Sequence, residues 1–514
     1  MFHREDFWLF ERVNGLSIYG GTLDGQGTGL WACKNSGKHC PQGATSLGFY
    51  NSNKVLVSGL SSLNSQFFHI NLDGCQNTRL EGVKISAPEN SPNTDGIHVQ
   101  SSSGVAITNS HIGTGDDCIS LGPGSSNIWI ENINCGPGHG ISIGSLGSNL
   151  QEPGVKNVTV KTVTLSGTQN GLRIKTWPMP SNGFVTGVLF QHAVMVNVKN
   201  PIIIDQNYCP NRAKCLGQAS GVRISDVTYQ DVHGTSATEV AVNFYCSKKY
   251  PCSRIILEDV NLSYKDRPAT ASCSLGFYNS NNVLVSGLSS LNSQIFHIIL
   301  DGCKNTRLEG VKISAPENSP NTDGIHVQSS SGVAITNSHI GTGDDCISLG
   351  PGSSNIWIEN INCGPGHGIS IGSLGSNLQE PGVKNVTVKT VTLSGTQNGL
   401  RIKTWAMPSN GFVTGVLFQH AVMVNVQNPI IIDQNYCPNR AKCPGQASGV
   451  RISDVTYQDV HGTSATEVAV NFYCSKKYPC SRIILEDVNL SYKDRPATAS
   501  CVNAGGSSSG FMCL

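Results

Sequence analysis

The sequence predicts an all-β chain that folds as two tandem copies of a parallel β-helix, a solenoid in which each coil of strands stacks on the one before. Three observations predict this class: a long internal duplication, a shorter repeat of alternating apolar residues inside each copy, and Gly, Asn or Ser at the corners between repeats. Apolar patterns typical of amphipathic helices are nearly absent. We expect each coil to bury its inward Val, Ile and Leu side chains against the neighbouring coils.

The duplication covers most of the chain. Residues 46–273 recur as residues 274–501, at an offset of 228 positions. The two copies differ at seven positions, which are Lys54/Asn282, Phe67/Ile295, Asn71/Ile299, Gln76/Lys304, Pro178/Ala406, Lys199/Gln427 and Leu216/Pro444. We therefore expect two domains, residues 1–273 and residues 274–514, each with a full set of the motifs described below.

A shorter period runs through each copy. In the first copy the pattern apolar-x-apolar starts at eight positions that lie 23 to 34 residues apart: Val55, Thr78, Val105, Ile128, Val158, Val188, Val222 and Ile255. Alternation at period two predicts strands with one buried face. Asn127, Asn157 and Gly221 stand just before strands, where a tight corner favours a positive φ. The spacing lacks the four-strand pattern of a propeller blade, and hairpin signals are too sparse for a β-sandwich, the two competing classes.

Composition excludes several classes of protein. Only 13% of the residues are charged and the net charge is +1, which argues against a charged disordered chain and against a basic nucleic-acid binder. No apolar run reaches the roughly 18 residues of a membrane span. The sequence therefore predicts neither nucleic acid nor membrane as a partner.

The N-terminus and the number of cysteines give conflicting indications of the cellular compartment. The first residues do not form a signal peptide, since Glu5 and Asp6 come early and the apolar stretch is short. Yet 19 cysteines are many for a reducing compartment, and their odd number leaves at least one unpaired. We expect a secreted, extracellular protein whose signal peptide is missing from this chain; the alternative is a cytosolic protein with many free thiols.

Four short clusters in successive coils carry the residues that could do chemistry. They are Asn93-Thr-Asp95-Gly-Ile-His98, Gly113-Thr-Gly-Asp116-Asp117-Cys118, Gly138-His139-Gly140 and Arg173-Ile-Lys175. Stacked coils lie about 4.8 Å apart, so this spacing brings three Asp, one His, one Arg and one Lys onto one outer face. Arg173 and Lys175, two residues apart on a strand, point to the same face. Two cations beside three carboxylates suit an anionic sugar or a phosphate.

The adjacent carboxyls predict acid and base chemistry. An ideal strand would send Asp116 and Asp117 to opposite faces, so we expect a bend or bulge that turns both outward. Close carboxylates disfavour joint ionisation, which leaves one with a raised pKa as an acid and another as a base. Each cluster alone is typical of a turn or a solvated strand, and only the four together favour a site.

Metal binding is the competing hypothesis for these carboxyls. Clustered Asp side chains can hold calcium, but the chain has no EF-hand spacing, and the neighbouring Arg and Lys oppose a cation. Zinc is disfavoured because no Cys-x2-Cys pair exists. We expect no metal and no cofactor.

The four clusters, in this order, resemble the signatures of plant-like polygalacturonases, glycoside hydrolase family 28. Gly20-Gly-Thr-Leu-Asp-Gly-Gln-Gly27 and Asp205-Gln-Asn-Tyr208-Cys also resemble that family. The resemblance covers essentially the whole chain, twice over. It implies a right-handed, pectin-lyase-like parallel β-helix that hydrolyses α-1,4 bonds between galacturonic acid units of pectin with inversion, in cell-wall modification. Family members have further N-terminal coils, so the first domain is expected to be N-terminally truncated.

The resemblance also implies roles for individual residues. Asp116 is similar to the general acid, Asp95 and Asp117 to the pair that activates water, and His139 to a residue that orients the acid. The implied substrate-binding residues are Arg173, Lys175 and Tyr208, the first two on the uronate carboxylate. The second copy carries the same set as Asp323, Asp344, Asp345, His367, Arg401, Lys403 and Tyr436. Inversion requires roughly 6.5–9.5 Å between the acid and base carboxyls.

The cysteines fit an oxidised pattern of that family, although connectivity is not readable from sequence. The implied pairs are Cys118/Cys135, Cys209/Cys215 and Cys246/Cys252. Cys273 resembles the partner of a cysteine in the C-terminal tail, which in this chain is Cys513. Cys501 can also pair with Cys513, which would leave Cys273 without a partner. We expect a monomer that acts on polygalacturonate in the cell wall. Two alternatives stay open: an inactive duplicate that at most binds polysaccharide, and a calcium-dependent pectate lyase.

Overall fold

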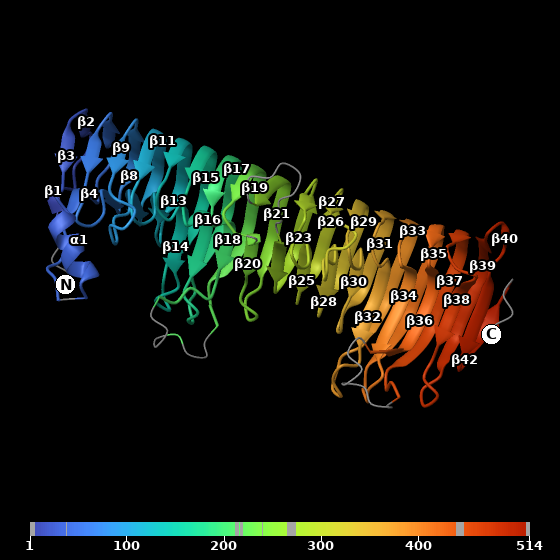
Figure 1. Ribbon diagram of the computed structural model, residues 1–514. Coiled ribbons are helices and arrows are strands. Elements are labelled where there is room, and N and C mark those ends of the chain that lie inside the picture. Colours follow the sequence, from blue (N-terminus) through green and yellow to red (C-terminus); the bar gives the residue numbers. More distant parts are fainter. Residues whose placement is uncertain are drawn as a thin grey trace. The chain divides into compact units, whose positions relative to one another are not determined.

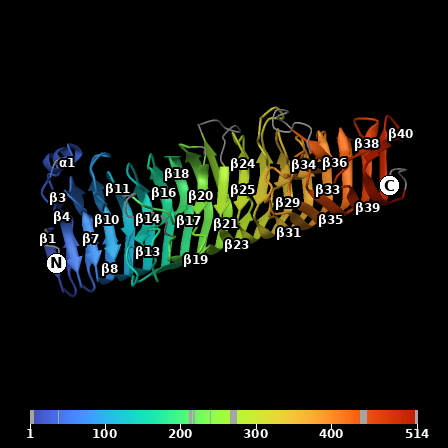
Figure 2. The same cartoon turned by 90° about the horizontal axis from the view of Figure 1, so that it is seen from below.

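The computed structural model describes residues 6–37, 39–210, 215, 219–238, 240–264, 274–437 and 447–509. The chain divides into two compact units, Met1–Pro268 and Ala269–Leu514. Within each unit, nearly every element is a strand that pairs in parallel with strands of the preceding and following coils (Figures 1 and 2). The predicted all-β parallel β-helix is confirmed.

Two sheets run along the first unit. Sheet A consists, in order of pairing, of β1 (Asp6–Glu11), β4 (Thr45–Tyr50), β7 (Ile70–Asp73), β10 (Ile97–Gln100), β12 (Ile119–Leu121), β14 (Ile141–Leu146), β16 (Asn170–Thr176), β18 (Asn200–Asp205) and β20 (Val240–Tyr245). Sheet B consists of β2 (Ser17–Tyr19), β5 (Leu56–Ser58), β8 (Gln76–Glu81), β11 (Ser103–Gly113), β13 (Ser126–Cys135), β15 (Val155–Ser166), β17 (Phe184–Val198), β19 (Arg223–Ser236) and β21 (Cys252–Tyr264), with β3 (Thr22–Asp24), β6 (Ser61–Leu63) and β9 (Lys84–Ser86) alongside.

The second unit has the same two sheets. Its sheet A consists of β22 (Ser274–Tyr278), β25 (Ile298–Asp301), β28 (Ile325–Gln328), β30 (Ile347–Leu349), β32 (Ile369–Leu374), β34 (Asn398–Trp405), β36 (Asn428–Tyr436), β38 (Val468–Tyr473) and β41 (Thr498–Val502). Its sheet B consists of β23 (Ser280–Ser286), β26 (Lys304–Glu309), β29 (Ser331–Gly341), β31 (Ser354–Cys363), β33 (Val383–Ser394), β35 (Phe412–Val426), β37 (Arg451–Ser464), β39 (Cys480–Tyr492) and β42 (Ala504–Ser508), with β24 (Ser289–Leu291), β27 (Lys312–Ser314) and the antiparallel β40 (Arg495–Pro496).

The core follows the predicted period in most coils. Successive apolar residues of sheet B lie in register and are at most 2% exposed, as for Val105, Ile128, Val158 and Val188. The prediction is wrong at Val222, which precedes β19. The residue in register there is Val227, which pairs with Val188 and with Ile255. β19 carries two apolar alternations, so the period alone could not select the one that stacks.

The corners are built from residues in the left-handed region. Asn127 and Asn157 have φ values of 54° and 55°, as predicted. Their side chains stack from coil to coil, with Asn157 Nδ2 donating to Asn127 Oδ1 at 3.1 Å. Gly221 differs from the prediction, since its φ is not positive; a Cβ there would meet Ser181 N at 2.2 Å. Glycine is needed at that corner for close approach of two backbone segments.

Disulfides close several of the loops. The predicted bonds Cys118–Cys135, Cys209–Cys215 and Cys246–Cys252 are present, and the second unit repeats two of them as Cys346–Cys363 and Cys474–Cys480. A further bond, which was not predicted, joins Cys33 of α1 (Thr28–Asn35) to Cys40. Cys75 and Cys303 are buried free thiols. Cys273 and Cys513, on which the remaining prediction falls, lie outside the described residues.

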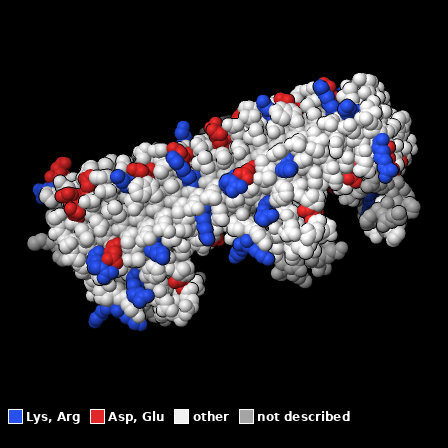
Figure 3. Space-filling view, turned by 180° about the vertical axis from the view of Figure 1, so that it is seen from behind, with Lys and Arg blue, Asp and Glu red and all other residues white. Residues whose placement is uncertain are grey.

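The surface matches the composition. Figure 3 shows Lys, Arg, Asp and Glu scattered over a largely uncharged face, in keeping with the 13% of charged residues. Over the described ranges, α1 is the only helix, and none is long and apolar enough to cross a membrane.

Candidate active site

Register in sheet A assembles the site. On the outward face, His98 of β10 pairs with Ser120 of β12, Ser120 with Ser142 of β14, and Ser142 with Arg173 of β16. Each step is one coil, so four residues that are far apart in sequence form a single row. Ile174, between the two cations, is fully buried in the core, which leaves Arg173 and Lys175 on the outward face.

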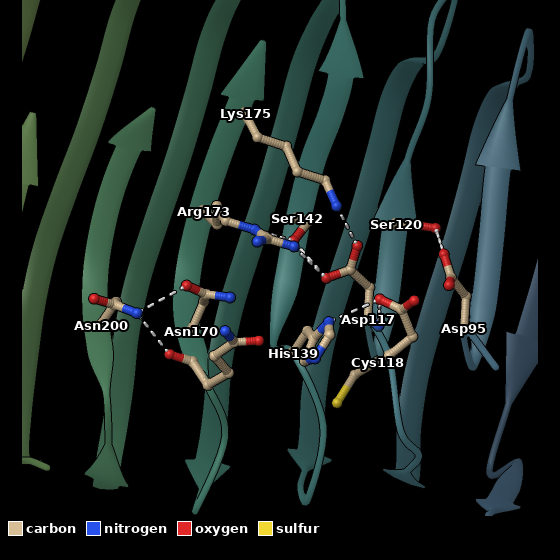
Figure 4. A network of polar contacts seen from close by, with 12 residues as sticks. Asp95, Asp117, Cys118, Ser120, His139, Ser142, Asn170, Arg173, Lys175 and Asn200 are labelled. Atoms are coloured by element: carbon tan, nitrogen blue, oxygen red, sulfur yellow. Dashed lines mark hydrogen bonds and ion pairs between the residues drawn. The ribbon is translucent and has the colours of Figure 1, made fainter. Parts of the chain in front are cut away.

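Asp117 is the centre of a buried ion cluster. Its Oδ1 accepts from Ser142 Oγ at 2.7 Å and from Arg173 Nη2 at 2.8 Å, and its Oδ2 accepts from Lys175 Nζ at 2.9 Å. Figure 4 shows both cations reaching toward this carboxylate. Burial alone would raise the pKa of Asp117, but the charges of Arg173 and Lys175 outweigh it and hold that pKa below its ordinary value. Asp117 is therefore an ionised, fixed carboxylate.

Asp116 lies at a bend between β11 and β12 and has a different environment. Its Oδ1 accepts from the backbone N–H of Asp117 at 2.9 Å and lies 2.9 Å from His139 Nδ1. Its side chain is 21% exposed, against 2% for Asp117. The bend gives the two neighbours separate partners, so the more accessible carboxyl is the one that contacts the imidazole.

Asp95 is the carboxyl with the raised pKa. It lies two residues before β10 and is 7% exposed, and its Oδ2 accepts from Ser120 Oγ at 2.6 Å (Figure 4). Burial raises the pKa of Asp95, and the charges of Asp117 and Asp116 add to the effect. In the second unit, burial and the charge of the neighbouring ion-paired carboxylate raise the pKa of Asp323 to about 7.

Aromatic side chains border the cations. Lys175 Nζ lies 5.2 Å and Arg173 Cζ 5.9 Å from the centroid of the Tyr208 ring. Trp177 meets Tyr208 edge to face at 5.9 Å, and its Nε1 donates to Ser145 Oγ at 3.2 Å. The predicted residue Tyr208 thus lies beside the two predicted cations, and Trp177 fixes its ring.

The second unit reproduces this arrangement. Asp345 accepts from Ser370 Oγ at 2.7 Å, Arg401 Nη2 at 2.9 Å and Lys403 Nζ at 2.9 Å, and His367 Nδ1 lies 2.8 Å from Asp344 Oδ1. Burial tends to raise the pKa of Asp344, but the hydrogen bond and charge of His367 lower it overall. The seven predicted residues of this copy all line one open cleft of about 480 Å³: Asp323, Asp344, Asp345, His367, Arg401, Lys403 and Tyr436.

One set of groups in each unit has the spacing of metal ligands. Atoms of Asp116, Asp117 and His139 all lie within 4.8 Å of one another. A cation there would compete with Arg173 and Lys175 for Asp117, whose oxygens both already accept hydrogen bonds. The donor set therefore fits an ion cluster with the protein's own cations better than a metal centre.

Two serines of the site were not predicted from the sequence, and no role was predicted for His98, which the first cluster contains. Ser120 holds Asp95, Ser142 holds both Asp117 and Arg173, and His98 Nδ1 lies 2.7 Å from Ser120 Oγ. Their signal is weak because Ser is common throughout the chain. Aligning Ile119-Ser-Leu with Ile141-Ser-Ile as successive strands would have placed both serines in the outward row.

The chain is similar in sequence to known proteins. The model of the family described as glycosyl hydrolases family 28 matches residues 3–280 and again residues 270–510. A polygalacturonase of Prunus persica is 66% identical over 269 residues, 52% of this chain and 68% of its own length. An exopolygalacturonase of Platanus acerifolia is 48% identical over 278 residues, 53% of this chain and 74% of its own. A crystal structure of endo-xylogalacturonan hydrolase from Aspergillus tubingensis is 23% identical with a TM-score of 0.49, over 54% of this chain and 77% of that one.

Proposed function

Because this chain belongs to glycosyl hydrolases family 28, we propose that it hydrolyses the α-1,4 bonds between galacturonic acid units of pectin by inverting acid and base catalysis. One observation carries the proposal most directly. A fixed, ionised Asp117 is bound by two cations beside a more exposed Asp116 and a buried Asp95 of raised pKa. That set supplies separate groups for binding an acidic sugar, protonating a leaving oxygen and activating water.

Arg173 and Lys175 are proposed to bind the uronate carboxylate at the cleavage site. A guanidinium has five N–H donors and an ammonium three, and the contacts with Asp117 and Ser142 use only part of them. Charge-assisted hydrogen bonds of this kind favour a carboxylate over a neutral sugar. The Tyr208 ring beside them offers a flat face to the sugar.

Asp116 is proposed to donate a proton to the glycosidic oxygen as the carbon–oxygen bond breaks. His139 contacts this carboxyl and orients it. A bound uronate adds negative charge beside Asp116 and excludes water, and both effects raise a carboxyl pKa, so protonation of the acid accompanies substrate binding.

Asp95 and Asp117 are proposed to activate the water that attacks the anomeric carbon from the opposite side. Burial makes the ionised form of Asp95 a stronger base than an exposed carboxylate, so Asp95 takes the water's proton. Asp117, held by Arg173 and Lys175, keeps its charge throughout and orients the water. Oxygens of Asp116 and Asp117 lie within 4.8 Å of each other, closer than the roughly 6.5–9.5 Å expected between the acid and the base of an inverting enzyme, so Asp95 is proposed as the base. Attack opposite the leaving oxygen gives inversion.

We further propose that residues 1–273 and 274–514 are two polygalacturonase-like β-helices, each with its own cleft, in a secreted monomer that acts in the cell wall. The two compact units and the repeated hydrogen bonds support two clefts. The disulfides support an oxidising, extracellular location.

Product analysis on polygalacturonate tests the proposal. Release of reducing ends by the purified chain, without ultraviolet-absorbing unsaturated products, is the expected result. Unsaturated ends that require calcium would indicate a lyase. Binding of polygalacturonate without any product would indicate an inactive polysaccharide-binding duplicate.

A further inference from the structure

The two clefts carry identical catalytic and substrate-binding residues, and the main difference between them lies on one flank. Two of the seven exchanges between the copies fall there: Phe67/Ile295 and Asn71/Ile299. They lie on or just before β7 in the first unit and β25 in the second, the strands that pair with β10 and β28. We call these regions the β7 flank and the β25 flank.

The β7 flank combines a polar side chain, a stack of rings and a nearby cation. Asn71 pairs with His98 in the sheet, and its Nδ2 donates to the hydroxyl of Tyr50 at 2.9 Å. A stack of rings continues outward from His98: the Phe68 centroid lies 4.6 Å from it, and the Phe67 centroid 4.0 Å from Phe68.

A lysine completes the β7 flank. Lys34 of α1 places its Nζ 5.9 Å from the centroid of Phe67. Lys34 belongs to the residues that precede the first copy, so it has no counterpart in the second. The outer end of the ring stack is therefore positively charged in the first unit.

The β25 flank is apolar. Ile299 pairs with His326, and Phe296 stacks on His326 at 4.7 Å and lines the cleft. Ile295, the counterpart of Phe67, is 52% exposed. The charged side chain of this strand is Asp301, two residues from Ile299 and so on the same face. The first unit has the same carboxylate, Asp73 of β7, so Asp301 does not distinguish the two flanks. The difference is that Ile295 and Ile299 add two aliphatic side chains to the β25 flank.

A third exchange, on the other side of Arg173 and Lys175 from β7, replaces a positively charged residue by a neutral one in the second copy. Lys199, exposed and directly before Asn200, is Gln427 in the second copy. Asn200 Nδ2 donates to the carbonyl of Gln169, and the counterpart of Gln169 lines the second cleft. Among the residues that the structure describes, the second unit thus has no lysine that corresponds to Lys34 or to Lys199.

We propose that the second cleft accepts a methyl-esterified galacturonate over the β25 flank, whereas the first cleft prefers a free galacturonate over the β7 flank. The inference rests on the proposed function. A methyl ester adds a methyl group that Ile295, Phe296 and Ile299 can bury. Lys34 in the first unit instead attracts a carboxylate. The catalytic carboxylates still act beside a free uronate held by Arg401 and Lys403.

Chains with one working cleft test this inference. Asp344→Asn inactivates the second cleft, so that only the first one works. Asp116→Asn inactivates the first cleft, so that only the second one works. For each variant, kcat/KM is measured on unesterified polygalacturonate and on pectin of intermediate methyl esterification. We expect the ratio of esterified to unesterified kcat/KM to be at least fivefold higher for the second cleft. Equal ratios, or activity from the first cleft alone, would overturn the inference while leaving the proposed function standing.

Exchanging the flank residues tests whether they cause the difference in kcat/KM ratio between the two clefts. In the Asp116→Asn chain, Ile295→Phe with Ile299→Asn should move the ratio toward that of the first cleft. Lys304→Gln, which also restores a first-copy residue but lies on sheet B, is the matched control and should leave the ratio unchanged. A flank exchange without effect counts against the inference. Absence of any product from both single-cleft chains would instead refute the proposed function, and this inference with it.

Discussion

Two neighbouring carboxyls of the site should respond very differently to the same substitution. Asp117 is 2% exposed on its side chain, and the Arg173 and Lys175 side chains that it neutralises are only 11% and 9% exposed. Asp117→Asn removes the negative charge and leaves two buried cations without a counter-charge. Breaking a buried ion pair in this way costs about 3–5 kcal/mol. Asp116→Asn loses one hydrogen bond to a half-exposed histidine, which costs about 1 kcal/mol.

Urea unfolding of matched variants measures this difference. Because the site occurs twice, each change is made in both copies, as Asp117→Asn/Asp345→Asn and as Asp116→Asn/Asp344→Asn. At an m-value of about 3 kcal/mol/M, the first variant should unfold at a midpoint roughly 1 M lower than the second. Both should lose activity, but the first should lose much more stability than the second. Equal midpoints would refute the ion cluster as a structural element.

Further expectations follow from burial, loop length and charge. The pKa of Asp323 is raised from 3.8 to about 7 in the folded state. Between these two pH values the folded state keeps a proton that the unfolded state has released. The free energy of unfolding therefore falls by up to about 4 kcal/mol as the pH rises from 3.8 to about 7. Asp323→Asn should flatten the dependence of the urea midpoint on pH, and an unchanged slope would contradict the buried carboxyl. Replacing Cys118 and Cys135 together by Ser opens a loop of 17 residues and should cost about 3 kcal/mol, seen as a lower Tm by calorimetry; an unchanged Tm would count against the bond. Chelation by EDTA should leave the rate on polygalacturonate unchanged, because the oxygens of Asp117 already accept from the protein's own donors; a loss restored by calcium would contradict this assignment.

Alternating apolar residues were sufficient to predict the fold class but not every register. The predicted strand positions Val105, Ile128, Val158 and Val188 do stack in sheet B. Val222 does not, because Val227 is the residue that pairs with Val188. The two valines are five residues apart and so of opposite phase, yet both are fully buried, with Asp226 in the left-handed region between them. A period-two pattern does not show such a corner, so it could not select the residue that stacks.

The site was predictable as a set of residues and less so as an electrostatic arrangement. Four motifs at the coil spacing placed Asp95, Asp116, Asp117 and the two cations together. The sequence could not show that both cations bind Asp117, nor that the raised pKa belongs to Asp95. Those properties depend on which carboxyl is buried and on the serine that each one meets, and side-chain rotamers decide both.

The central claim is that stacked coils place an acid, a base and a uronate-binding pair in each of two clefts. Its most direct test is the rate of reducing-end release from polygalacturonate by Asp116→Asn, Asp344→Asn and the chain with both changes. We predict that each single variant keeps the activity of the other cleft and that the double variant loses about 10²–10⁴-fold, the usual contribution of a general acid. A double variant that is folded and as active as the original chain would contradict the account.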